Sequence, residues 1–281
     1  MSETQTKLVG LIGWPIEHSL SPVMHEAAFS ALSLDWRYLA MPVRPGGIND
    51  AIDGLVALGF RGANVTIPYK QTVLPLLDDL SQEARQIGAV NTIVIEGGGR
   101  TIGHNTDSGG FIASLRDGGF HPSGKTAIIA GAGGGARAVV HALLAAGVEK
   151  VTVLSRTRAH AQELMRSFDD SRVHTGKLDQ EQIIEGARSA NLLVNATPVG
   201  MWPNVSGSIW PDSAGIPAHL TVLDLVYNPL ETRLLQLAKE SGAQAISGIE
   251  MLIHQGAAAF ELWTGMSAPI DAMRLALKEG R

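Results

Sequence analysis

Apolar and polar positions alternate in a regular pattern over the second half of the chain. The apolar run 126–130 leads into a glycine-rich turn, and the stretch 138–146 that follows is rich in Ala, Val and Leu, as expected of a helix. Another apolar run at 150–154 completes a strand–helix–strand unit. Further strands are predicted near 172–174, 192–195, 221–225 and 244–246. This alternation of strands and helices predicts a Rossmann-type, doubly wound parallel sheet.

The first half shows a less regular α/β pattern. Strands are predicted at 7–12 and 36–43, and helical spacing occupies 48–58. After Gly62 comes a strand in which alternate residues share a face. We expect Ala63, Val65 and Ile67 to face the core, and Asn64 and Thr66 to point together the other way.

The order of elements predicts two α/β domains. Two helices, at 248–264 and 269–278, follow the last strand. We predict a substrate domain built from 1–106 with 248–281 and a nucleotide domain at 107–247, with the C-terminal helices returning to the first domain. The substrate is expected in a cleft between the domains, where pockets often form.

Two predicted helix starts carry polar residues whose interpretation is open. Ser21 precedes Pro22, which is the usual arrangement of an N-cap and a first helical residue. Ser19 has no such structural task, which makes it the more suggestive of the two serines. Asp107 precedes a helix predicted from about Ser108, where an N-cap role is the simple interpretation.

Composition narrows the class of protein. The chain has 281 residues, of which 45% are hydrophobic, and its net charge is −5 without a cluster of Lys and Arg, which argues against nucleic acid as a partner. Cysteine is absent, so disulfides, thiolate nucleophiles and Cys-based zinc sites are excluded. The polar N-terminus does not resemble a signal peptide, and no apolar run could span a membrane. We expect a soluble cytoplasmic protein.

The glycine-rich turn at 131–136 has the features of a dinucleotide site. Gly131 permits a tight turn, Gly133 lets the backbone approach a pyrophosphate, and the small Ala136 allows close packing of helix on strand. The N–H groups at the helix start favour phosphate. An ordinary glycine turn is the alternative, but both flanking strands and the helix support a cofactor site.

The end of the next strand favours NADP over NAD. NAD sites usually place Asp or Glu there, to bind the ribose hydroxyls. Here the strand ends in Ser155-Arg156-Thr157-Arg158 and carries no acid. Two guanidinium groups with two hydroxyls suit a 2′-phosphate. Solvated arginines at a helix start are the alternative interpretation.

Other apparent motifs carry little weight. Residues 119–126 match the P-loop pattern letter for letter, but a predicted helix precedes them and a strand follows, which is the reverse of the required context. The nine histidines show no ligand spacing, and His25 and His254 are interpreted as packed or surface residues. No metal is expected.

Together, the short motifs resemble the shikimate dehydrogenase family over nearly the whole chain. They occur in the family's order at 18–22, 64–70, 88–92, 105–107, 131–138, 155–157, 195–201, 227–229, 248–252 and 255–257. The resemblance implies reduction of 3-dehydroshikimate to shikimate by NADPH, a step in aromatic amino-acid (chorismate) biosynthesis. Small-molecule substrates, no nucleic-acid or membrane partner, and a monomer or homodimer are expected.

The resemblance also implies the roles of individual residues. Ser19 and Ser21, assisted by Tyr227, are expected to bind the substrate carboxylate. Asn64, Thr66, Asn91 and Gln255 are expected to bind ring hydroxyls, and Lys70 and Asp107, which also bind the substrate, to form the catalytic pair. The expected cofactor ligands are Gly131, Ala132, Gly133, Gly134, Gly135, Ala136, Ser155, Arg156, Thr157, Arg158, Ala196, Thr197, Pro198, Met201, Leu225, Gly248 and Met251.

The chemistry of Lys70 and Asp107 agrees with these roles. Hydride delivery to a ketone builds negative charge on the oxygen, which an ammonium can stabilise or protonate. A neighbouring carboxylate would hold the lysine in position and keep it charged.

This sequence departs from the family pattern at several positions. Trp14, His104 and Ser108-Gly109-Gly110 bear on substrate preference, and Ser155 and His160 bear on cofactor preference, because His160 stands where many NADP-using members carry a basic residue. A quinate/shikimate dehydrogenase with relaxed NAD and NADP use is the alternative within the family. A methylene-tetrahydrofolate dehydrogenase and an inactive dinucleotide-binding regulatory protein are alternatives of other classes. The serine pair argues against the former, and Lys70 with Asp107 argues against the latter.

Overall fold

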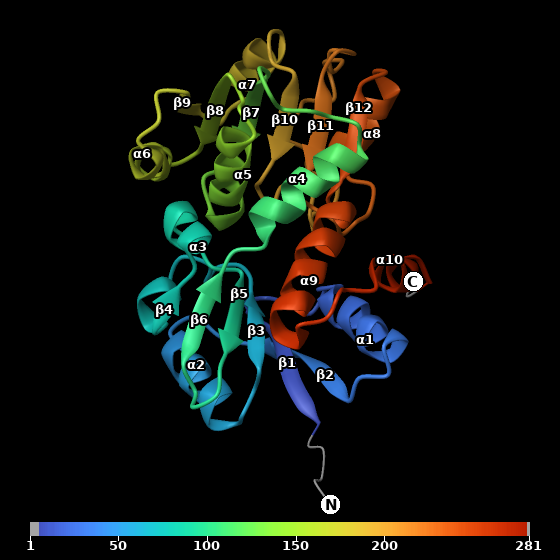
Figure 1. The fold of residues 1–281 in the computed structure, drawn as a ribbon. Helices are drawn as coiled ribbons and strands as arrows, with labels where there is room; N and C mark the ends of the chain where they lie inside the picture. The colour runs from blue at the N-terminus through green and yellow to red at the C-terminus, as the bar shows by residue number, and fades with distance from the viewer. Residues whose placement is uncertain (1–5, 280–281) are drawn as a thin grey trace, which may run out of the picture. The chain divides into compact units, whose positions relative to one another are not determined.

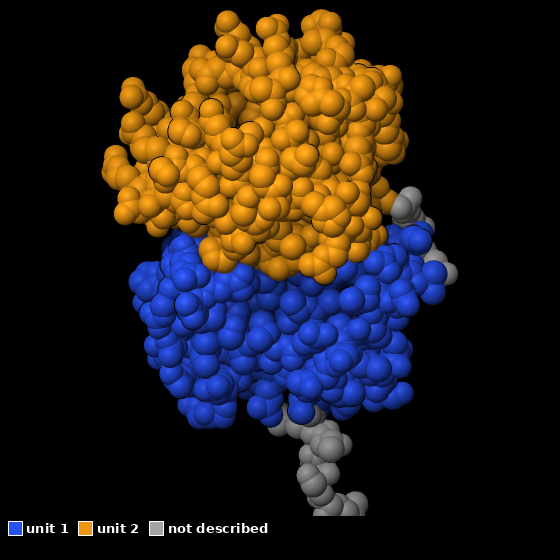
Figure 2. Space-filling model, turned by 45° about the horizontal axis from the view of Figure 1, so that its top comes forward, with its two compact units in different colours: residues 1–106, 253–281 blue, residues 107–252 orange. Residues whose placement is uncertain are grey.

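The computed structural model describes residues 6–279, and they divide into two compact units. Unit 1 comprises Met1–Thr106 and Ile253–Arg281, and unit 2 comprises Asp107–Leu252 (Figure 2). The second boundary falls inside helix α9 (Gly248–Thr264), whereas the sequence pattern placed it at 247, where this helix begins.

Unit 1 contains a mixed six-stranded sheet in the order β2-β1-β3-β5-β6-β4 (Figure 1). Its strands are β1 (Lys7–Gly13), β2 (Trp36–Pro42), β3 (Gly62–Val65), β4 (Asp79–Leu80), β5 (Thr92–Ile95) and β6 (Thr101–His104). β1 runs parallel to β2 and β3, and β5 runs antiparallel to β3 and β6. The apolar run of β1 fits a central strand that is covered on both faces.

Helices cover both faces of this sheet. They are α1 (Ser21–Ala31), α2 (Ile48–Ala57), the 3₁₀ turn η1 (Leu74–Leu76), α3 (Gln82–Ile87), α9 from Ile253 onward and α10 (Ile270–Glu279). On one face, Ile52 and Leu55 of α2 pack in a core with strand residues such as Val65. In a separate aromatic group, Phe29 of α1 lies 5.4 Å from Phe260 of α9, measured between ring centroids.

Unit 2 is the predicted doubly wound parallel sheet, with strand order β12-β11-β10-β7-β8-β9. Its strands are β7 (Thr126–Ala130), β8 (Lys150–Ser155), β9 (Val173–Lys177), β10 (Leu192–Asn195), β11 (Thr221–Asp224) and β12 (Gln244–Ser247). Its helices are α4 (Asp107–Asp117), α5 (Gly134–Ala145), α6 (Arg158–Phe168), α7 (Gln180–Ala187) and α8 (Arg233–Glu240), followed by the first turn of α9. Neighbouring strands are all parallel, which confirms the fold prediction.

The two faces of the second sheet carry separate cores. Val139 of α5 and Leu164 of α6 pack against one face, and Ile183 of α7 and Leu234 of α8 pack against the other. Because the chain winds outward in both directions from β7 and β10, the carboxyl ends of these two strands form the topological switch point, where open α/β sheets bind ligands.

Two local predictions are wrong in detail, and two short elements were not predicted. Ile67 does not face the core: β3 ends at Val65, and Ile67 lies in the following turn with 57% of its surface exposed. Helix α5 begins at Gly134 rather than at 138, because Gly133 is already its N-cap. The sequence analysis also missed β4 and α3, since their segments are too short to show a period.

Within residues 6–279, no helix combines the length and the apolar character that a membrane span requires.

Candidate active site

Asn64 lies in the middle of the first sheet and is almost completely buried. Its Oδ1 accepts a hydrogen bond from the Tyr38 hydroxyl at 2.8 Å. Its Nδ2 donates to the Asn91 carbonyl at 3.2 Å and to Thr92 Oγ1 at 3.0 Å. The contacts on both sides of the amide fix its orientation, since only Oδ1 can accept and only Nδ2 can donate.

Asn91 extends this network to the C-terminal part of unit 1. Its Oδ1 accepts from the Thr106 backbone N–H at 2.7 Å, and its Nδ2 donates to Gln255 Oε1 on α9 at 3.2 Å. The structure therefore connects three predicted substrate ligands, Asn64, Asn91 and Gln255, which are far apart in the sequence. A buried amide network of this kind is held rigid by its own hydrogen bonds.

The two serines at the start of α1 have local roles that differ from the predicted ones. Helix α1 already begins at Ser21, with Leu20 at the N-cap position and no capping bond from that side chain. The Ser19 hydroxyl accepts the Ser21 backbone N–H at 3.2 Å. The Ser19 side chain therefore satisfies a backbone N–H at the start of the helix, which is the task predicted for Ser21. The reason is that Leu20 already has αR geometry, so the helix begins one residue earlier than predicted.

Thr66 and Lys70 follow the carboxyl end of β3. Thr66 N–H donates to the Ile12 carbonyl at 2.9 Å, and Val90 N–H donates to the Lys70 carbonyl at 2.7 Å. Both side chains are half-buried. The backbone around Lys70 is therefore hydrogen-bonded to β1 on one side and to the segment before β5 on the other.

Asp107 and Tyr227 belong to unit 2. Asp107 is the first residue of α4 rather than its N-cap, and only 4% of it is exposed. Its neighbour Ser108 hydrogen-bonds through Oγ to His141 Nδ1 on α5 at 3.1 Å. Tyr227 follows β11 and is half-buried. Since Lys70 belongs to unit 1, its pairing with Asp107 stays a prediction, as does the cleft.

The glycine turn of unit 2 fits a dinucleotide pyrophosphate. Gly131 has a φ of +113°, and a Cβ there would lie 2.7 Å from the Ala196 carbonyl oxygen, so only glycine fits. A Cβ at Gly133 would meet no heavy atom of residues 6–279 within 4 Å. Gly133 has no side chain to cap α5, which leaves N–H groups at the start of this helix for an anion.

The turn after β8 fits the adenosine end of NADP. Ser155 Oγ accepts the Thr157 backbone N–H at 3.2 Å, which closes a tight turn. Arg156 and Arg158 are exposed, and Arg158 opens α6. No carboxylate belongs to this turn to repel a 2′-phosphate, so the residues present suit the phosphorylated cofactor.

A buried network organises the loop after β10. Asn195 Nδ2 donates to Asp224 Oδ1 at 2.9 Å, and Asn195 Oδ1 accepts the Thr197 backbone N–H at 3.1 Å. Thr232 donates to the second oxygen of Asp224 at 2.6 Å. Burial raises the pKa of Asp224 to about 6. Asp224 was not predicted as a functional residue, although an acid inside a predicted buried strand was an available signal.

The remaining predicted cofactor residues lie along the carboxyl edge of the second sheet or on the first turn of α9. Ala136 is buried in α5, and a Cβ at Gly248 would lie 2.6 Å from the Asp224 carbonyl oxygen. Gly134 and Gly135 form the start of α5. The others lie in the turns after β7, β10 and β11 or in α9: Ala132, Ala196, Pro198, Met201, Leu225 and Met251. Their contacts with a cofactor stay predictions.

His25 is a packed residue, as interpreted from the sequence. It is fully buried, and its ring stacks on Tyr38 with centroids 4.5 Å apart. Neither ring nitrogen has a hydrogen-bond partner among the described residues, and burial lowers the pKa of His25 to about 3. His25 therefore packs neutral behind the tyrosine that contacts Asn64.

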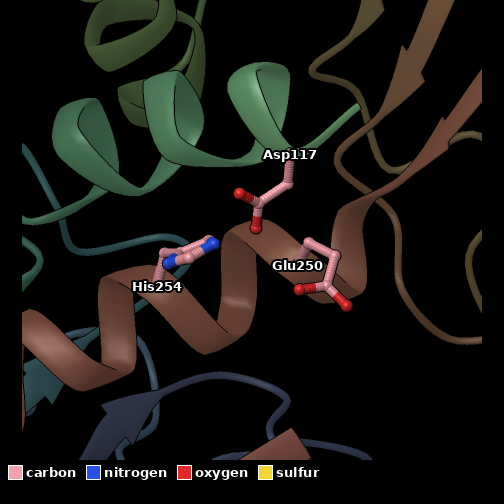
Figure 3. Close-up of side chains that lie close together, drawn as sticks. All are labelled: Asp117, Glu250 and His254. Carbon is pink, nitrogen blue, oxygen red and sulfur yellow. The ribbon is translucent and has the colours of Figure 1, made fainter. Parts of the chain in front are cut away.

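One group of side chains has metal-ligand spacing that the sequence analysis overlooked. Asp117 and Glu250 of unit 2 offer carboxylate oxygens within 4.8 Å of each other, and His254 follows Glu250 by one turn of α9 (Figure 3). Acidic groups often gather at helix ends without a cation, and this group by itself is no metal site.

The class of protein follows from the two units. A Rossmann-type sheet with a glycine turn is typical of proteins that bind a dinucleotide, and the other α/β unit carries a buried amide network. This combination defines a dinucleotide-dependent oxidoreductase. Three family models match the chain: the shikimate dehydrogenase substrate binding domain at 11–93, shikimate/quinate 5-dehydrogenase at 116–199 and the shikimate 5′-dehydrogenase C-terminal domain at 248–278.

The chain belongs to the shikimate dehydrogenase family. It is 46% identical to the shikimate dehydrogenase (NADP(+)) of Moorella thermoacetica over 281 residues, covering 99% of this chain and 94% of the relative. The Thermus thermophilus shikimate 5-dehydrogenase crystal structure with NADP(H) and shikimate has a TM-score of 0.87 at 39% identity, covering 98% and 100% of the two chains. A quinate dehydrogenase from Corynebacterium glutamicum in complex with NAD has a TM-score of 0.87 at 36% identity, covering 97% and 99%.

Proposed function

We propose that this chain catalyses the reversible, NADPH-dependent reduction of 3-dehydroshikimate to shikimate, a step in aromatic amino-acid biosynthesis. The observation that carries this proposal is the amide network that connects Asn64, Asn91 and Gln255. A ring with several hydroxyl groups needs donors and acceptors in fixed positions, and amides supply both. Ser19 and Ser21, with Tyr227, are proposed to bind the carboxylate of the substrate.

Cofactor use rests on the second unit. In this proposal the N–H groups at the start of α5 bind the pyrophosphate, and Arg156 and Arg158 bind the 2′-phosphate. The missing acid at the end of β8 and the exposure of both arginines support NADP rather than NAD.

The chemical step assigns separate tasks to the protein and the cofactor. NADPH, when bound, supplies a hydride to the carbonyl carbon of the substrate. Lys70 carries the proton that the carbonyl oxygen takes up as the C=O group becomes CH–OH. Before that transfer, the ammonium stabilises the negative charge that develops on this oxygen. Asp107 accepts a hydrogen bond from the same hydroxyl and holds the lysine ammonium in position.

A comparison of two substrates and two cofactors tests the proposal. Oxidation of shikimate and of quinate is measured, each with NADP and with NAD, and the four values of kcat/KM are compared. We expect shikimate with NADP to give the highest value. A higher value for quinate with NAD would contradict the proposal, and no activity with any pair would favour an inactive dinucleotide-binding protein.

Quinate use is the second candidate function. The similarity to the quinate dehydrogenase of Corynebacterium glutamicum supports it, together with the departures from the family pattern at Trp14 and His104. The serine pair argues for shikimate, because quinate users often carry a bulkier hydroxyl residue at one of these positions. Comparable kcat/KM values for the two substrates would support this candidate.

We also propose that the protein acts in the cytoplasm as a monomer or a homodimer. The absence of a membrane-spanning helix in residues 6–279 is compatible with this location. Light scattering coupled to size-exclusion chromatography measures the assembly, and a larger oligomer would contradict the proposal.

A further inference from the structure

Lys177 lies at the carboxyl end of β9, beside the turn that carries Arg156 and Arg158. Strands β8 and β9 are neighbours in the sheet (Figure 1). In their parallel pairing, Ser155 is the register partner of Lys177. Neighbouring strands lie about 4.8 Å apart, so the two residues are adjacent across the strands. The sequence analysis ended this strand near 174 and did not consider the lysine.

The Cβ of Lys177 points to the face of the sheet on which α6 packs. Register partners on adjacent strands share a face, and the face alternates along each strand. A Cβ at Gly176 would meet Leu154 Cδ2 at 2.8 Å and Gln182 of α7 at 2.6 Å, which places this pair on the α7 face. Ser155 and Lys177, one residue further along, therefore belong to the opposite face, where the α6 residue Leu164 is buried.

Hydrogen bonds hold this end of β9 in place. Leu178 N–H donates to the Ser155 carbonyl at 3.1 Å, and Lys177 N–H donates to Gln182 Oε1 at 3.0 Å. The Lys177 ammonium lies 3.2 Å from Asp179 Oδ2, and 73% of its side chain is exposed. Asp179 is the N-cap of α7. The hydrogen bond from the Gln182 N–H lowers the pKa of the Asp179 carboxyl, and the hydrogen bond from the Lys177 ammonium lowers it further. A charged, fixed carboxylate thus keeps the ammonium at this edge.

A third cation beside this turn would strengthen the binding of a 2′-phosphate. A phosphate monoester carries between one and a half and two negative charges at about pH 7. Arg156 and Arg158 are exposed to water, which weakens each ionic contact.

We propose that Lys177 is a third cation of the 2′-phosphate site and contributes to the preference for NADP over NAD. This inference rests on the proposed NADP site at Arg156 and Arg158. The lysine binds the phosphate across the β8–β9 pair. Asp179 positions the ammonium, and Lys177 does not touch the reacting atoms.

Binding of two adenine nucleotides to the full-length protein tests the role of Lys177. 2′,5′-ADP carries the 2′-phosphate and 5′-AMP lacks it, and calorimetric titration gives a Kd for each. We expect Lys177→Met to weaken 2′,5′-ADP binding about five- to tenfold and to leave 5′-AMP binding unchanged, because one charge-assisted contact is lost. Lys177→Arg keeps the charge and should retain most of the affinity.

Lys150→Met is the matched control. Lys150 is the exposed first residue of β8, at the opposite end of that strand from Ser155, and its replacement removes the same charge. We expect wild-type Kd values for both nucleotides. In turnover, Lys177→Met should raise the KM for NADP about five- to tenfold, with kcat and the KM for NAD unchanged.

Three results would overturn the inference: equal weakening of both nucleotides, equal effects of the two Lys→Met variants, or no change with Lys177→Met. Equal weakening would show that Lys177 only supports β9. These titrations contain no substrate, so their outcome is separate from that of the shikimate assay. If the wild-type protein binds 2′,5′-ADP no better than 5′-AMP, the NADP site itself fails.

Discussion

At the scale of single residues, the orientation of Asn64 depends on a tyrosine from another strand. Tyr38 lies on β2, and its hydroxyl donates to Asn64 Oδ1 from a ring stacked on the buried His25. Nδ2 is directed at Asn91 and Thr92 by the same arrangement. A hydrogen bond that fixes an amide preorganises a binding site without contacting the ligand itself.

Tyr38→Phe is therefore expected to weaken substrate binding. It removes one buried hydrogen bond and leaves the ring, so the KM for shikimate should rise about three- to tenfold while kcat stays within about twofold. Tyr69→Phe is the control, because its hydroxyl donates to the Val43 carbonyl at 2.8 Å and not to the amide network. Both variants should lose similar thermal stability, and an equal rise in KM would contradict the positioning role of Tyr38.

Lys70→Ala tests the proposed proton donor. Loss of a general acid typically costs about 10²- to 10⁴-fold in rate, so kcat for shikimate oxidation should fall by that order while the KM changes less. Lys125→Ala, which removes an exposed lysine before β7, should keep wild-type kinetics. Near-normal turnover of a folded Lys70→Ala protein would remove Lys70 from its proposed role.

At the scale of elements, the two glycines of the β7–α5 turn meet different requirements. Gly131 serves the backbone conformation, and Gly133 leaves space for a ligand. Gly131 is needed for the fold, because its φ is positive and its Cα faces the Ala196 carbonyl. Gly133 has a φ of −85° and open space around the position of a Cβ, so the fold itself tolerates a methyl group there. A ligand is the remaining reason for glycine at 133.

The two glycines should respond differently to replacement by alanine. Gly131→Ala forces both strain and a backbone clash, and its Tm should fall by roughly 3 to 8 °C. Gly133→Ala should keep a Tm within about 1 °C of the wild type and weaken NADP binding at least about tenfold, since the methyl group occupies the approach to the pyrophosphate. Thermal unfolding and NADP titration measure the two effects, and wild-type NADP affinity of Gly133→Ala would argue against a pyrophosphate at this turn.

At the scale of the whole molecule, two buried groups give stability opposite dependences on pH. Asp224 has a pKa of about 6 against an ordinary value of 3.8, so the folded state binds the extra proton between these values. His25 has a pKa of about 3 against 6.5, so the unfolded state binds the extra proton there. Asp224 therefore makes the folded state less stable as pH rises from about 4 to 6. His25 makes the folded state less stable as pH drops from about 6.5 towards 3.

Variants of these two residues should separate the contributions. Between pH 4 and 6, the Tm of Asp224→Asn relative to wild type should increase with rising pH, because the variant has no carboxylate to bury. The Tm of His25→Phe relative to wild type should increase as pH falls below about 6.5, because phenylalanine does not take up a proton. Tm is measured from pH 4 to 8, and curves parallel to the wild type would contradict either assignment.

Much of this molecule was predictable from local pattern. The family, the enzyme class, the NADP cofactor and the parallel sheet were predicted and are confirmed, because strand–helix periodicity and short motifs are local properties of a chain. Helix starts were less certain. The error at Ser21 arose because Leu20 adopts helical geometry before the proline, a backbone choice that composition does not reveal.

The sequence by itself determined the family and which sheet would form, and it predicted which residues carry the chemistry. Only the tertiary structure decided that Tyr38 contacts Asn64, that Gln255 joins Asn91 and that Lys177 lies beside Ser155. These pairs are 26, 164 and 22 positions apart. Strand order and register bring them together, and both depend on non-local packing of whole elements. A glycine turn can be read from a dozen residues, whereas a hydrogen-bond network across a sheet requires the complete fold.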